Sequence, residues 1–310
     1  MTEDREPFFS IIMVSLNGAP VIARALESIR ATEYDRYEVL VVDNGSTDNL
    51  AEVVRTGFPE VLLIQSPINL GFAGGNNLGM RQAQGDVLVL LNDDTEVRPG
   101  WLRAWAQAMR ERPRWGVLGC KLLYPGGRLI QHAGGVVESN GQTHHIGYEQ
   151  EDDGRFDEIR ACDYVTGAAI ALRREMVRRL GPLDEKYFPI YFEETDYCWQ
   201  ARRVGYEVLY VPDSVVIHHE SRTQGRFSFR FVFRYTRCRM RFLLKCFSNR
   251  ELLRAARQEL RWWRRFRSNR AFYLPFFAGY VAALWRLPWL LRDRQVFRRR
   301  MAELARENER

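Results

Sequence analysis

VLVLLNDDT, residues 87–95, is the stretch that best predicts the fold of this chain. Its five apolar, strand-forming residues indicate a strand that is buried on both faces of a parallel sheet. Asn92, Asp93 and Asp94 follow at the carboxyl edge of the sheet, where open α/β sheets bind their ligands. Two adjacent carboxylates repel each other and resist desolvation, so they need a cation or an arginine beside them. The alternative is a polar loop in which Asp94 or Thr95 caps the next helix.

Buried strands and amphipathic helices alternate along the chain. FFSIIMVS at 8–15 and YEVLVV at 37–42 are two further buried strands, and a helix that begins near Pro20 separates them. This alternation predicts an α/β fold with a doubly wound, Rossmann-like, mostly parallel sheet and right-handed crossovers. Other strands are predicted at 61–64, 116–123, 164–172, 206–211 and 215–217, helices at 101–110, 173–180 and from about 190 to 205, and hairpins and loops at 126–153.

The 310 residues suffice for a full α/β domain plus an appendage, and their charge is divided between two regions. Residues 1–221 carry 22 basic and 33 acidic side chains, whereas residues 222–310 carry 24 basic and 6 acidic ones. We therefore predict an α/β domain at 1–222 and a basic, aromatic-rich helical C-terminal region at 223–310. Five scattered cysteines without a Cys-x-x-Cys pair, and a polar, acidic N-terminus without a secretory signal, lead us to expect a cytoplasmic protein.

Polar residues at 43–48 follow the second predicted strand. Asp43 is placed to accept a hydrogen bond from the imide N–H of a uracil or thymine base. Asn44 and Ser46 are candidate donor-binding residues beside it. A helix cap at Ser46 or Asp48 is the structural alternative, and it is compatible with the first interpretation.

The glycine-rich stretch NLGFAGGNNLG, residues 69–79, is neither a dinucleotide-binding G-x-G-x-x-G motif nor a P-loop. We predict a loop that opens a helix and lets the backbone approach a nucleotide, with helix N–H groups nearby. Its candidate donor-binding residues are Asn69, Gly71, Asn76 and Asn77. The alternative is a tight strand-to-helix connection without a ligand.

Three acids, Glu193, Glu194 and Asp196, fall within four residues at the start of a predicted helix. The helix macrodipole favours acids at this place, which is the structural alternative. Beside apolar neighbours these carboxyls cannot all keep ordinary pKa values, and one of them can serve as a general base. His218 follows the last predicted strand, where a histidine is commonly structural. Because acids are predicted at other strand ends nearby, a contact of His218 with a metal or a phosphate is the second interpretation.

Seven segments between residues 8 and 247 occur in the order of one known pattern. The sequence resembles the inverting family-two nucleotide-sugar glycosyltransferases with the GT-A fold, and within them the bacterial rhamnosyltransferase-like branch. The segments are SIIMVSLNG (10–18), VVDNGSTDN (41–49), NLGFAGGNNLG (69–79), VLLNDDTEV (89–97), VTGAAIALRR (165–174), GPLDEKYFPIYFEETDYCWQARRVGY (181–206) and VPDSVVIHHESRT (211–223).

The resemblance implies roles for the polar residues at the strand ends. Asp43 would contact the nucleobase. Asp94, together with Asp93, would form the metal-binding acidic motif that holds Mg²⁺ or Mn²⁺ on the diphosphate. Asn92 stands where that motif often has its first Asp, and it would contact the ribose, the metal or neither. His218 matches a histidine that contacts the metal or the diphosphate.

The resemblance also implies a mechanism. Glu194 takes the position of the catalytic base, in a segment where the family usually has Glu-Asp-x-Asp and this chain has Glu193-Glu194-x-Asp196. The cation would neutralise the leaving nucleoside diphosphate while Glu194 deprotonates an acceptor hydroxyl, and a single displacement would invert the anomeric carbon.

The expected reaction moves a sugar from a dTDP- or UDP-sugar, with dTDP-L-rhamnose as the first candidate, to a glycan or lipid-linked acceptor in cell-surface polysaccharide synthesis. Residues 126–154, with His132, His144 and His145, are expected to help shape the acceptor site. A non-catalytic nucleotide-sugar or glycan-binding module with the same fold is the alternative from another class.

The basic C-terminal region has three interpretations. Its charge allows nucleic acid binding, but no recognised motif supports it, so we expect no nucleic-acid partner. A solvated or homo-oligomer-forming helical face is the second interpretation, and docking on the anionic inner leaflet of the cell membrane is the third. The apolar run 271–291 is long enough to span a bilayer, but Pro275, Arg286 and Pro288 favour a surface-lying or core helix. We therefore expect a peripheral protein at the inner face of the membrane.

Overall fold

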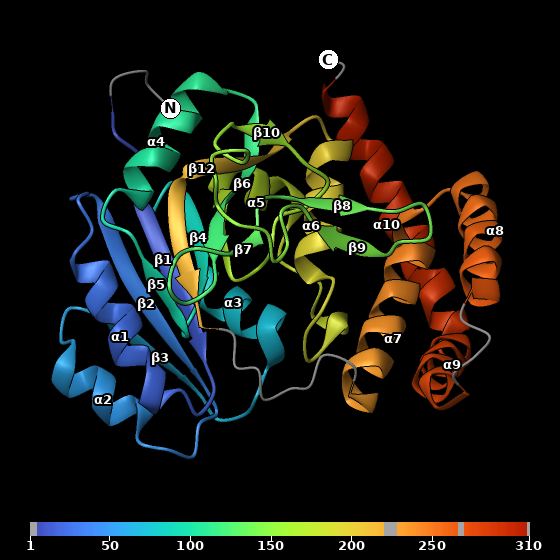
Figure 1. Cartoon of the computed structure of the whole chain (residues 1–310), viewed down its shortest axis with the longest axis horizontal. Helices are drawn as coiled ribbons and strands as arrows, with labels where there is room; N and C mark the ends of the chain where they lie inside the picture. Colours follow the sequence, from blue (N-terminus) through green and yellow to red (C-terminus); the bar gives the residue numbers. More distant parts are fainter. Residues whose placement is uncertain (1–4, 220–227, 266–269, 309–310) are drawn as a thin grey trace.

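Strands and helices alternate along the first part of the chain (Figure 1). The structure is a computed structural model that describes residues 5–219, 228–265 and 270–308. The strands are β1 Phe9–Ser15, β2 Tyr37–Asn44, β3 Leu62–Ser66, β4 Val87–Asn92, β5 Thr95–Val97, β6 Trp115–Leu123, β7 Ile130–His132, β8 Gly135–Val137, β9 Thr143–His145, β10 Arg160–Ala161, β11 Ala169–Arg173 and β12 Glu207–His218. The helices are α1 Ala19–Arg30, α2 Leu50–Gly57, α3 Gly71–Gln82, α4 Trp101–Glu111, α5 Arg174–Leu180, the 3₁₀ turn η1 Glu185–Tyr187, α6 Glu193–Arg203, α7 Phe229–Cys246, α8 Asn249–Arg265, α9 Arg270–Trp285 and α10 Leu287–Asn308.

The central sheet has the strand order β10-β12-β6-β11-β4-β1-β2-β3. β4, β1, β2 and β3 pair in parallel, and β12 pairs in parallel with β6. β11 is inserted antiparallel between β4 and β6. The predicted α/β class with a mostly parallel sheet is therefore confirmed, with β11 as a strand whose direction the sequence did not reveal.

β4, the strand from which the fold was predicted, lies in the middle of the sheet. Its five apolar residues are at most 3% exposed, so the prediction of a strand buried on both faces is confirmed. One apolar cluster packs α1, α2 and α4 against one face, and a second packs α3, α5 and α6 against the other. A parallel strand covered on both faces needs a continuous apolar run rather than an alternating one.

β12 and β11 differ from the predicted strands. β12 is a single strand from Glu207 to His218, although two were predicted because Pro212 interrupts the apolar pattern. The pairing of β12 with β6 shifts between Val211 and Val215. Proline lacks a backbone donor, and a local irregularity lets the strand continue past it. β11 begins only at Ala169, so the first part of the predicted strand 164–172 is outside it.

The glycine-rich stretch is part of a helix rather than a loop. α3 begins at Gly71, so the predicted loop is wrong for most of residues 69–79. A Cβ atom on Gly75 would lie 2.5 Å from Cγ1 of Val14, and one on Gly79 would lie 2.4 Å from Cγ2 of Ile12. These glycines therefore allow α3 to lie against β1 at a distance that no larger residue permits.

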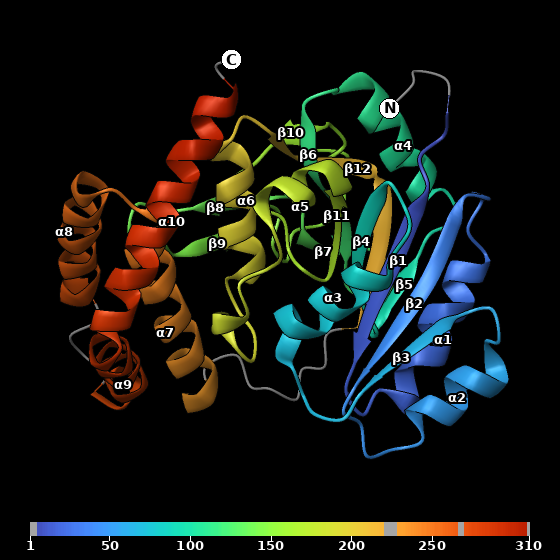
Figure 2. The ribbon, with the colours of Figure 1, turned by 180° about the vertical axis from the view of Figure 1, so that it is seen from behind.

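Of the C-terminal helices, α7 and α10 lie beside α6, and α8 and α9 lie farther out (Figure 2). α7 packs mainly on α9 and α10. Among the described residues, no single helix is long and apolar enough to cross a bilayer; α9 and α10 meet that criterion only as a pair, and the chain bends by 66° between them. The domain boundary predicted at residue 222 falls within 220–227, outside the described residues, as does the end of the segment 211–223.

Candidate active site

The carboxyl ends of β1, β2 and β4 meet at one edge of the sheet. In the parallel register Ser15 of β1 stands opposite Asp43 of β2, and Val14 stands opposite Asn92 of β4. Asp93 reaches back to the same place, where its Oδ2 accepts a hydrogen bond from the hydroxyl of Ser15. The structure thus brings together three of the residues that the sequence singles out.

Asp43 is buried, and two donors hold its carboxylate. Oδ1 accepts a hydrogen bond of 2.9 Å from the backbone N–H of Ser46, and Oδ2 accepts one of 3.2 Å from the side-chain amide of Gln65. Gln65 is the partner of Asp43 in the register of β2 and β3. Two bonds leave further lone pairs of the carboxylate free to accept from a ligand. Gln65 was not among the predicted site residues, because its only signal in the sequence is a polar residue late in a short apolar strand.

The amides of Asn44 and Asn69 close the turn that leads into α3. Oδ1 of Asn44 accepts from the backbone N–H of Leu70 at 2.8 Å, and its Nδ2 lies 3.3 Å from Oδ1 of Asn69. Oδ1 of Asn69 in turn accepts from the backbone N–H of Gly71 at 2.7 Å. These three predicted donor-binding residues therefore shape the backbone next to Asp43.

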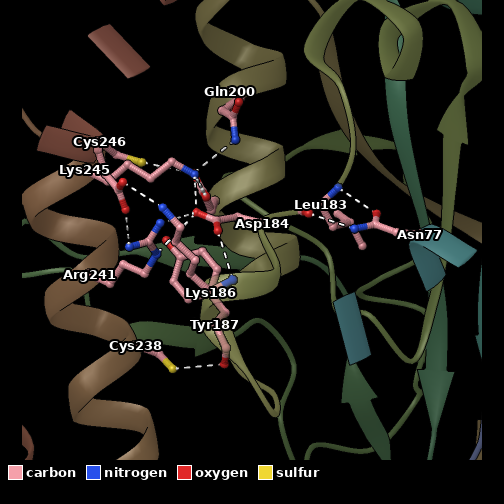
Figure 3. A network of polar contacts seen from close by, with 12 residues as sticks. Asn77, Leu183, Asp184, Lys186, Tyr187, Gln200, Cys238, Arg241, Lys245 and Cys246 are labelled. Carbon is pink, nitrogen blue, oxygen red and sulfur yellow. Dashed lines mark hydrogen bonds and ion pairs between the residues drawn. The ribbon is translucent and has the colours of Figure 1, made fainter. Parts of the chain in front are cut away.

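Asn76 and Asn77 point into the protein. The amide of Asn77 donates to the carbonyl of Leu183 at 2.9 Å and accepts from the N–H of Leu183 at 2.9 Å (Figure 3). It also donates to Oε1 of Glu185 at 2.8 Å. Asn76 donates to the carbonyl of Phe72 at 3.0 Å. Since the amide of Asn77 has its partners within the protein, its predicted contact with a nucleotide is not supported. It joins α3 to the segment before η1.

Asp93 and Asp94 follow β4 in an environment that separates their pKa values. Burial raises the pKa of Asp93 to about 6; the hydrogen bond from Ser15 opposes this shift and the charge of Asp94 adds to it. Burial also acts on Asp94, but the imidazole of His218, with Nε2 3.1 Å from Oδ1, holds the pKa of Asp94 below its ordinary value. The two acids therefore differ in charge near pH 6.

His218, at the end of β12, is oriented by a residue that sequence analysis missed. Its Nδ1 lies 2.7 Å from Oε1 of Gln131, a buried side chain of β7. An amide oxygen only accepts, so Nδ1 carries a proton, and Nε2 is left facing Asp94, with which it can share a second proton or a cation. Asn92 donates toward that Nε2 from 3.3 Å. The arrangement matches the way in which metal-binding histidines are held by a partner on the other ring nitrogen.

The pair of Asp94 and His218 fits a divalent cation. A lone pair on Nε2 and a carboxylate oxygen 3.1 Å away need a cation or a proton between them. Oδ1 of Asp94 is buried and accepts no well-directed hydrogen bond from the described residues. Within residues 5–219, 228–265 and 270–308, no three His, Cys, Asp or Glu side chains gather closely enough to hold a metal by themselves. Mg²⁺ and Mn²⁺ suit such a site, because substrate phosphates and water complete their coordination.

The start of α6 holds the predicted catalytic acids in an unusual backbone. Tyr191 and Phe192 have φ angles of 97° and 75°, a conformation that costs energy for bulky residues and is found mainly at functional sites. The ring of Phe192 is buried against Tyr235 and Phe242 of α7, which holds this conformation. α7 therefore helps to aim the first turn of α6.

Glu193 and Glu194 lie in different environments. Glu193 is 1% exposed, and neither carboxyl oxygen has a hydrogen-bond partner among the residues described. Burial, and then the charge of Glu194, raise the pKa of Glu193 well above its usual value, which favours the neutral form of this carboxyl. Glu194 is only half-buried. Burial raises the pKa of Glu194 to about 7, and the backbone N–H groups of the first turn limit this rise.

Asp196, the third predicted catalytic acid, belongs to a buried network of ion pairs (Figure 3). It pairs with Lys245 of α7, which also lies 2.9 Å from Asp184. Arg241 pairs with Asp184 at 2.7 Å and with Asp293 of α10 at 2.9 Å. A catalytic role of Asp196 is therefore not supported. A solvated face was one of the three interpretations of the basic region, but it does not hold for Lys245, whose side chain is 8% exposed.

The histidines of residues 126–154 divide into two groups. His132 and His145 stack edge to face with Nδ1 atoms 2.9 Å apart, and Tyr164 packs on both rings. Burial, and the charge of His144, lower the pKa of His145 to about 4. His144 itself pairs with Glu138 on the surface at 2.7 Å. Burial raises the pKa of Tyr164, and Glu194 is near enough to add to that rise, so this cluster lies close to the candidate base.

Comparison with protein families matches residues 10–181, more than half of the chain, to Glycosyl transferase family 2. The chain is 33% identical over 230 residues to an uncharacterized protein, y4gI, of Sinorhizobium fredii, and 32% identical over 221 residues to the O-antigen biosynthesis protein RfbC of Myxococcus xanthus. These alignments cover 71% and 68% of this chain but 25% and 17% of the two relatives, so the chain spans only a small part of their length. It is also 27% identical over 241 residues to the N-acetylglucosaminyl-diphospho-decaprenol L-rhamnosyltransferase of Mycobacterium tuberculosis, covering 70% of this chain and 77% of that protein.

Solved structures share the fold at low sequence identity. GalNAc-T7, crystallised with UDP, GalNAc and Mn²⁺, superposes with a TM-score of 0.63 at 16% identity and covers 78% of this chain and 48% of its own. The mannosyltransferase PcManGT of Pyrobaculum calidifontis, in complex with GDP-Man and Mn²⁺, has a TM-score of 0.55 at 19% identity and covers 95% of this chain and 75% of its own. The predicted GT-A fold and the predicted family are both confirmed. The protein belongs to glycosyltransferase family 2, a family of inverting glycosyltransferases.

Proposed function

We propose that the protein transfers a sugar from a nucleotide sugar to a hydroxyl group of a glycan or lipid-linked acceptor in polysaccharide synthesis, with inversion at the anomeric carbon. The observation that carries the proposal is the half-buried carboxyl of Glu194, whose pKa burial raises to about 7. A carboxyl with a pKa near the working pH is suited to act as a general base. Family membership and the biosynthetic names of two relatives support this assignment.

The donor would lie along the edge formed by β1, β2 and β4. Asp43, fixed by Ser46 and Gln65, is oriented to accept a hydrogen bond from an imide N–H of the base. The turn that Asn69 closes next to Asp43 limits the space for the base and ribose. A uracil or thymine base carries such an imide N–H, which favours UDP- or dTDP-sugars over other donors.

Asp94 and His218 would hold a divalent cation against the diphosphate. When bound, Mg²⁺ or Mn²⁺ offsets the negative charge that develops on the leaving nucleoside diphosphate. Gln131 keeps the proton of His218 on Nδ1, and Ser15 holds Asp93 in place beside the pair. Two structural neighbours were solved with Mn²⁺, which supports a cation of this class.

Glu194 would remove the proton of the acceptor hydroxyl. At pH 7 about half of this carboxyl is ionised, so it can accept a proton at an oxygen of its side chain. The hydroxyl oxygen then forms the new bond to the anomeric carbon while the bond to the diphosphate breaks, and the configuration inverts. The raised pKa of Glu193 favours its neutral form, which adds no second negative charge next to Glu194; such a charge would raise the pKa of the base further.

dTDP-L-rhamnose is the first donor to test, because a relative that aligns over 77% of its length is an L-rhamnosyltransferase. A panel of dTDP-, UDP- and GDP-sugars in a thermal-shift assay with Mn²⁺, followed by sugar transfer to a diphospholipid-linked acceptor, tests the proposal. Stabilisation by one donor together with transfer supports it. Stabilisation without transfer or donor hydrolysis would instead support the alternative, a non-catalytic binding module.

A further inference from the structure

The outer face of α9 carries large apolar side chains that the described residues leave uncovered. Leu274, Phe277, Val281, Leu284 and Trp285 recur at helical spacing and are exposed, and Trp285 is 81% exposed. The opposite face of α9 packs on α7. A helix that is apolar all round is usually buried all round, and a contiguous exposed apolar face marks a surface that meets a partner.

A hollow of about 570 Å³ lies beside this face, between α7, the segment around η1 and the bend from α9 to α10. Its lining includes four cations, Lys186, Arg237, Arg241 and Arg286, and the exposed rings of Trp285 and Trp289. The hollow therefore combines positive charge with aromatic side chains that border open solvent.

Two of the four cations have no acidic partner among the residues that the structure describes. Lys186 and Arg241 are paired with acids (Figure 3). Arg237 instead donates to the backbone carbonyl of Phe188, and Arg286 forms no ion pair with any residue that the structure describes. The hollow has a net positive charge at Arg237 and Arg286, and it suits an anionic group.

We propose that α9 and the start of α10 dock on an anionic lipid bilayer, with the apolar face in the interfacial layer and a lipid phosphate between Arg237 and Arg286. Tryptophan rings at the level of the lipid head groups and arginines beside them are the side chains that hold a helix in this layer. Anionic lipids add an attraction for each arginine close to the surface.

The charge of the face argues against a second copy of the chain as its partner. Arg286 adjoins this face and Arg237 lines the hollow beside it, and neither has an acidic partner among the described residues. Two copies of this face would bring like charges together, and an interface between identical patches must be complementary to itself. A surface of lipid phosphates has the opposite charge.

The hollow and the candidate active site lie on two sides of one short segment. Arg237 contacts the carbonyl of Phe188, and Phe72 at the start of α3 donates from its backbone to the carbonyl of Pro189 at 2.9 Å. The same segment continues into the first turn of α6, which carries Glu194. Docking would therefore bring the base close to the membrane surface. This consequence rests on the proposed transferase function, whereas the docking itself does not.

Co-sedimentation of the full chain with vesicles tests the proposal. We expect binding to vesicles of equal parts phosphatidylglycerol and phosphatidylcholine at low salt, a loss of binding at high salt, and little binding to phosphatidylcholine alone. Arg237→Gln combined with Arg286→Glu should weaken binding at least about 30-fold, because three units of positive charge are removed at the lipid surface. Trp285→Ser combined with Trp289→Ser should weaken binding to the same vesicles through lost apolar contact.

A matched control removes the same charge at the far side of the molecule. Arg110→Gln combined with Arg112→Glu changes exposed residues at the end of α4, which lies opposite α9 (Figure 1). These substitutions should leave vesicle binding within about three-fold, since the altered charges lie beyond the screening length from the bilayer. Thermal unfolding of each variant, and its stabilisation by the bound nucleotide sugar, show that the fold and the donor site are intact.

Four results would overturn the docking proposal. The first is equal binding to phosphatidylcholine vesicles alone, and the second is unchanged vesicle binding of the variant at Arg237 and Arg286. The third is displacement of the protein from vesicles by inorganic phosphate at constant ionic strength. The fourth is a dimer in sedimentation velocity that the tryptophan substitutions convert to monomer. The third result would point to a soluble phosphate ligand and the fourth to self-association. Vesicle binding without sugar transfer would leave the docking intact and contradict only the proposed function.

Discussion

Oε1 of Gln131 lies 2.7 Å from Nδ1 of His218, and this contact keeps a proton on Nδ1 while Nε2 faces Asp94. Replacing Gln131 with Leu removes the acceptor and leaves the proton free to move to Nε2. We expect the affinity for Mn²⁺ in the presence of nucleoside diphosphate to fall about 10–100-fold. Titration of Mn²⁺ followed by electron paramagnetic resonance measures this directly. Gln84→Leu, at an exposed glutamine, is the control, and equal affinities for the two variants would contradict the assigned role.

Glu194 and Glu193 should respond differently to the same substitution. Glu194→Gln removes the proton acceptor, and we expect kcat to fall at least about 100-fold while donor binding remains. Glu193→Gln replaces a buried carboxyl, whose raised pKa favours its neutral form, with a neutral amide of similar shape, so kcat should change less than about five-fold. Steady-state kinetics and calorimetric donor binding separate these effects. The reverse pattern would move the base to Glu193.

The pH dependence of transfer should follow the ionisation of Glu194. Its raised pKa of about 7 means that the active, deprotonated form accumulates as the pH rises. We therefore expect kcat/KM to increase with pH and to reach half of its plateau near pH 7, and to fall ten-fold per unit on the acid side. Donor binding measured over the same range is the control. A rate that is constant from about pH 5 to pH 8 would exclude a base with this pKa.

Lys245 should matter far more for stability than an exposed lysine does. Lys245→Met leaves Asp184 and Asp196 buried without their shared cation, and loss of one partner from such a network costs about 3–5 kcal/mol of unfolding free energy. Lys186→Met removes a 63% exposed lysine paired with Asp293 and should cost less than about 1 kcal/mol. Urea unfolding compares the two. Similar losses would mean that the network does not stabilise the packing of α7 on α6.

Gly75 should not tolerate even one methyl group. In Gly75→Ala the new Cβ would lie 2.5 Å from Cγ1 of Val14, so α3 and β1 must separate, and overpacking of this kind costs about 1–3 kcal/mol. Gly57→Ala, at the end of α2, meets open space and should be neutral or stabilising by up to about 1 kcal/mol. Thermal unfolding measures both changes. A neutral Gly75→Ala would show that the close approach of α3 is not required.

Local sequence predicted most of the α/β body. The continuous apolar run of β4 predicted a strand buried on both faces, and the polar residues after it predicted the edge of the sheet where the strand ends. Both features depend only on residues that are adjacent in the sequence. The break at Pro212 was misleading, since β12 continues beyond it by shifting its register against β6. Pairing irregularities depend on the partner strand, which the local pattern does not contain.

The contacts between distant segments were not predictable in this way. Arg241 and Lys245 have the spacing of a solvated helix face, and only the fold reveals that Asp184 and Asp196 meet them inside the protein. The same is true of Gln131, which gains its partner from a strand 87 residues away. A polar residue in an isolated sequence carries no mark that distinguishes a hydrogen bond to water from one to a distant side chain.

The ion pairs of Lys245 also limit how genes for such proteins can recombine. The family match ends at residue 181, yet Asp184, Asp196 and their cation on α7 all follow that point. Suppose that a crossover joins the segment up to α6 of one relative to the α7 of another. Asp184 and Asp196 would then be buried against a helix that was not selected to neutralise them. Helix α7 must therefore be inherited together with α6, or replaced only by one that carries a cation at the same position.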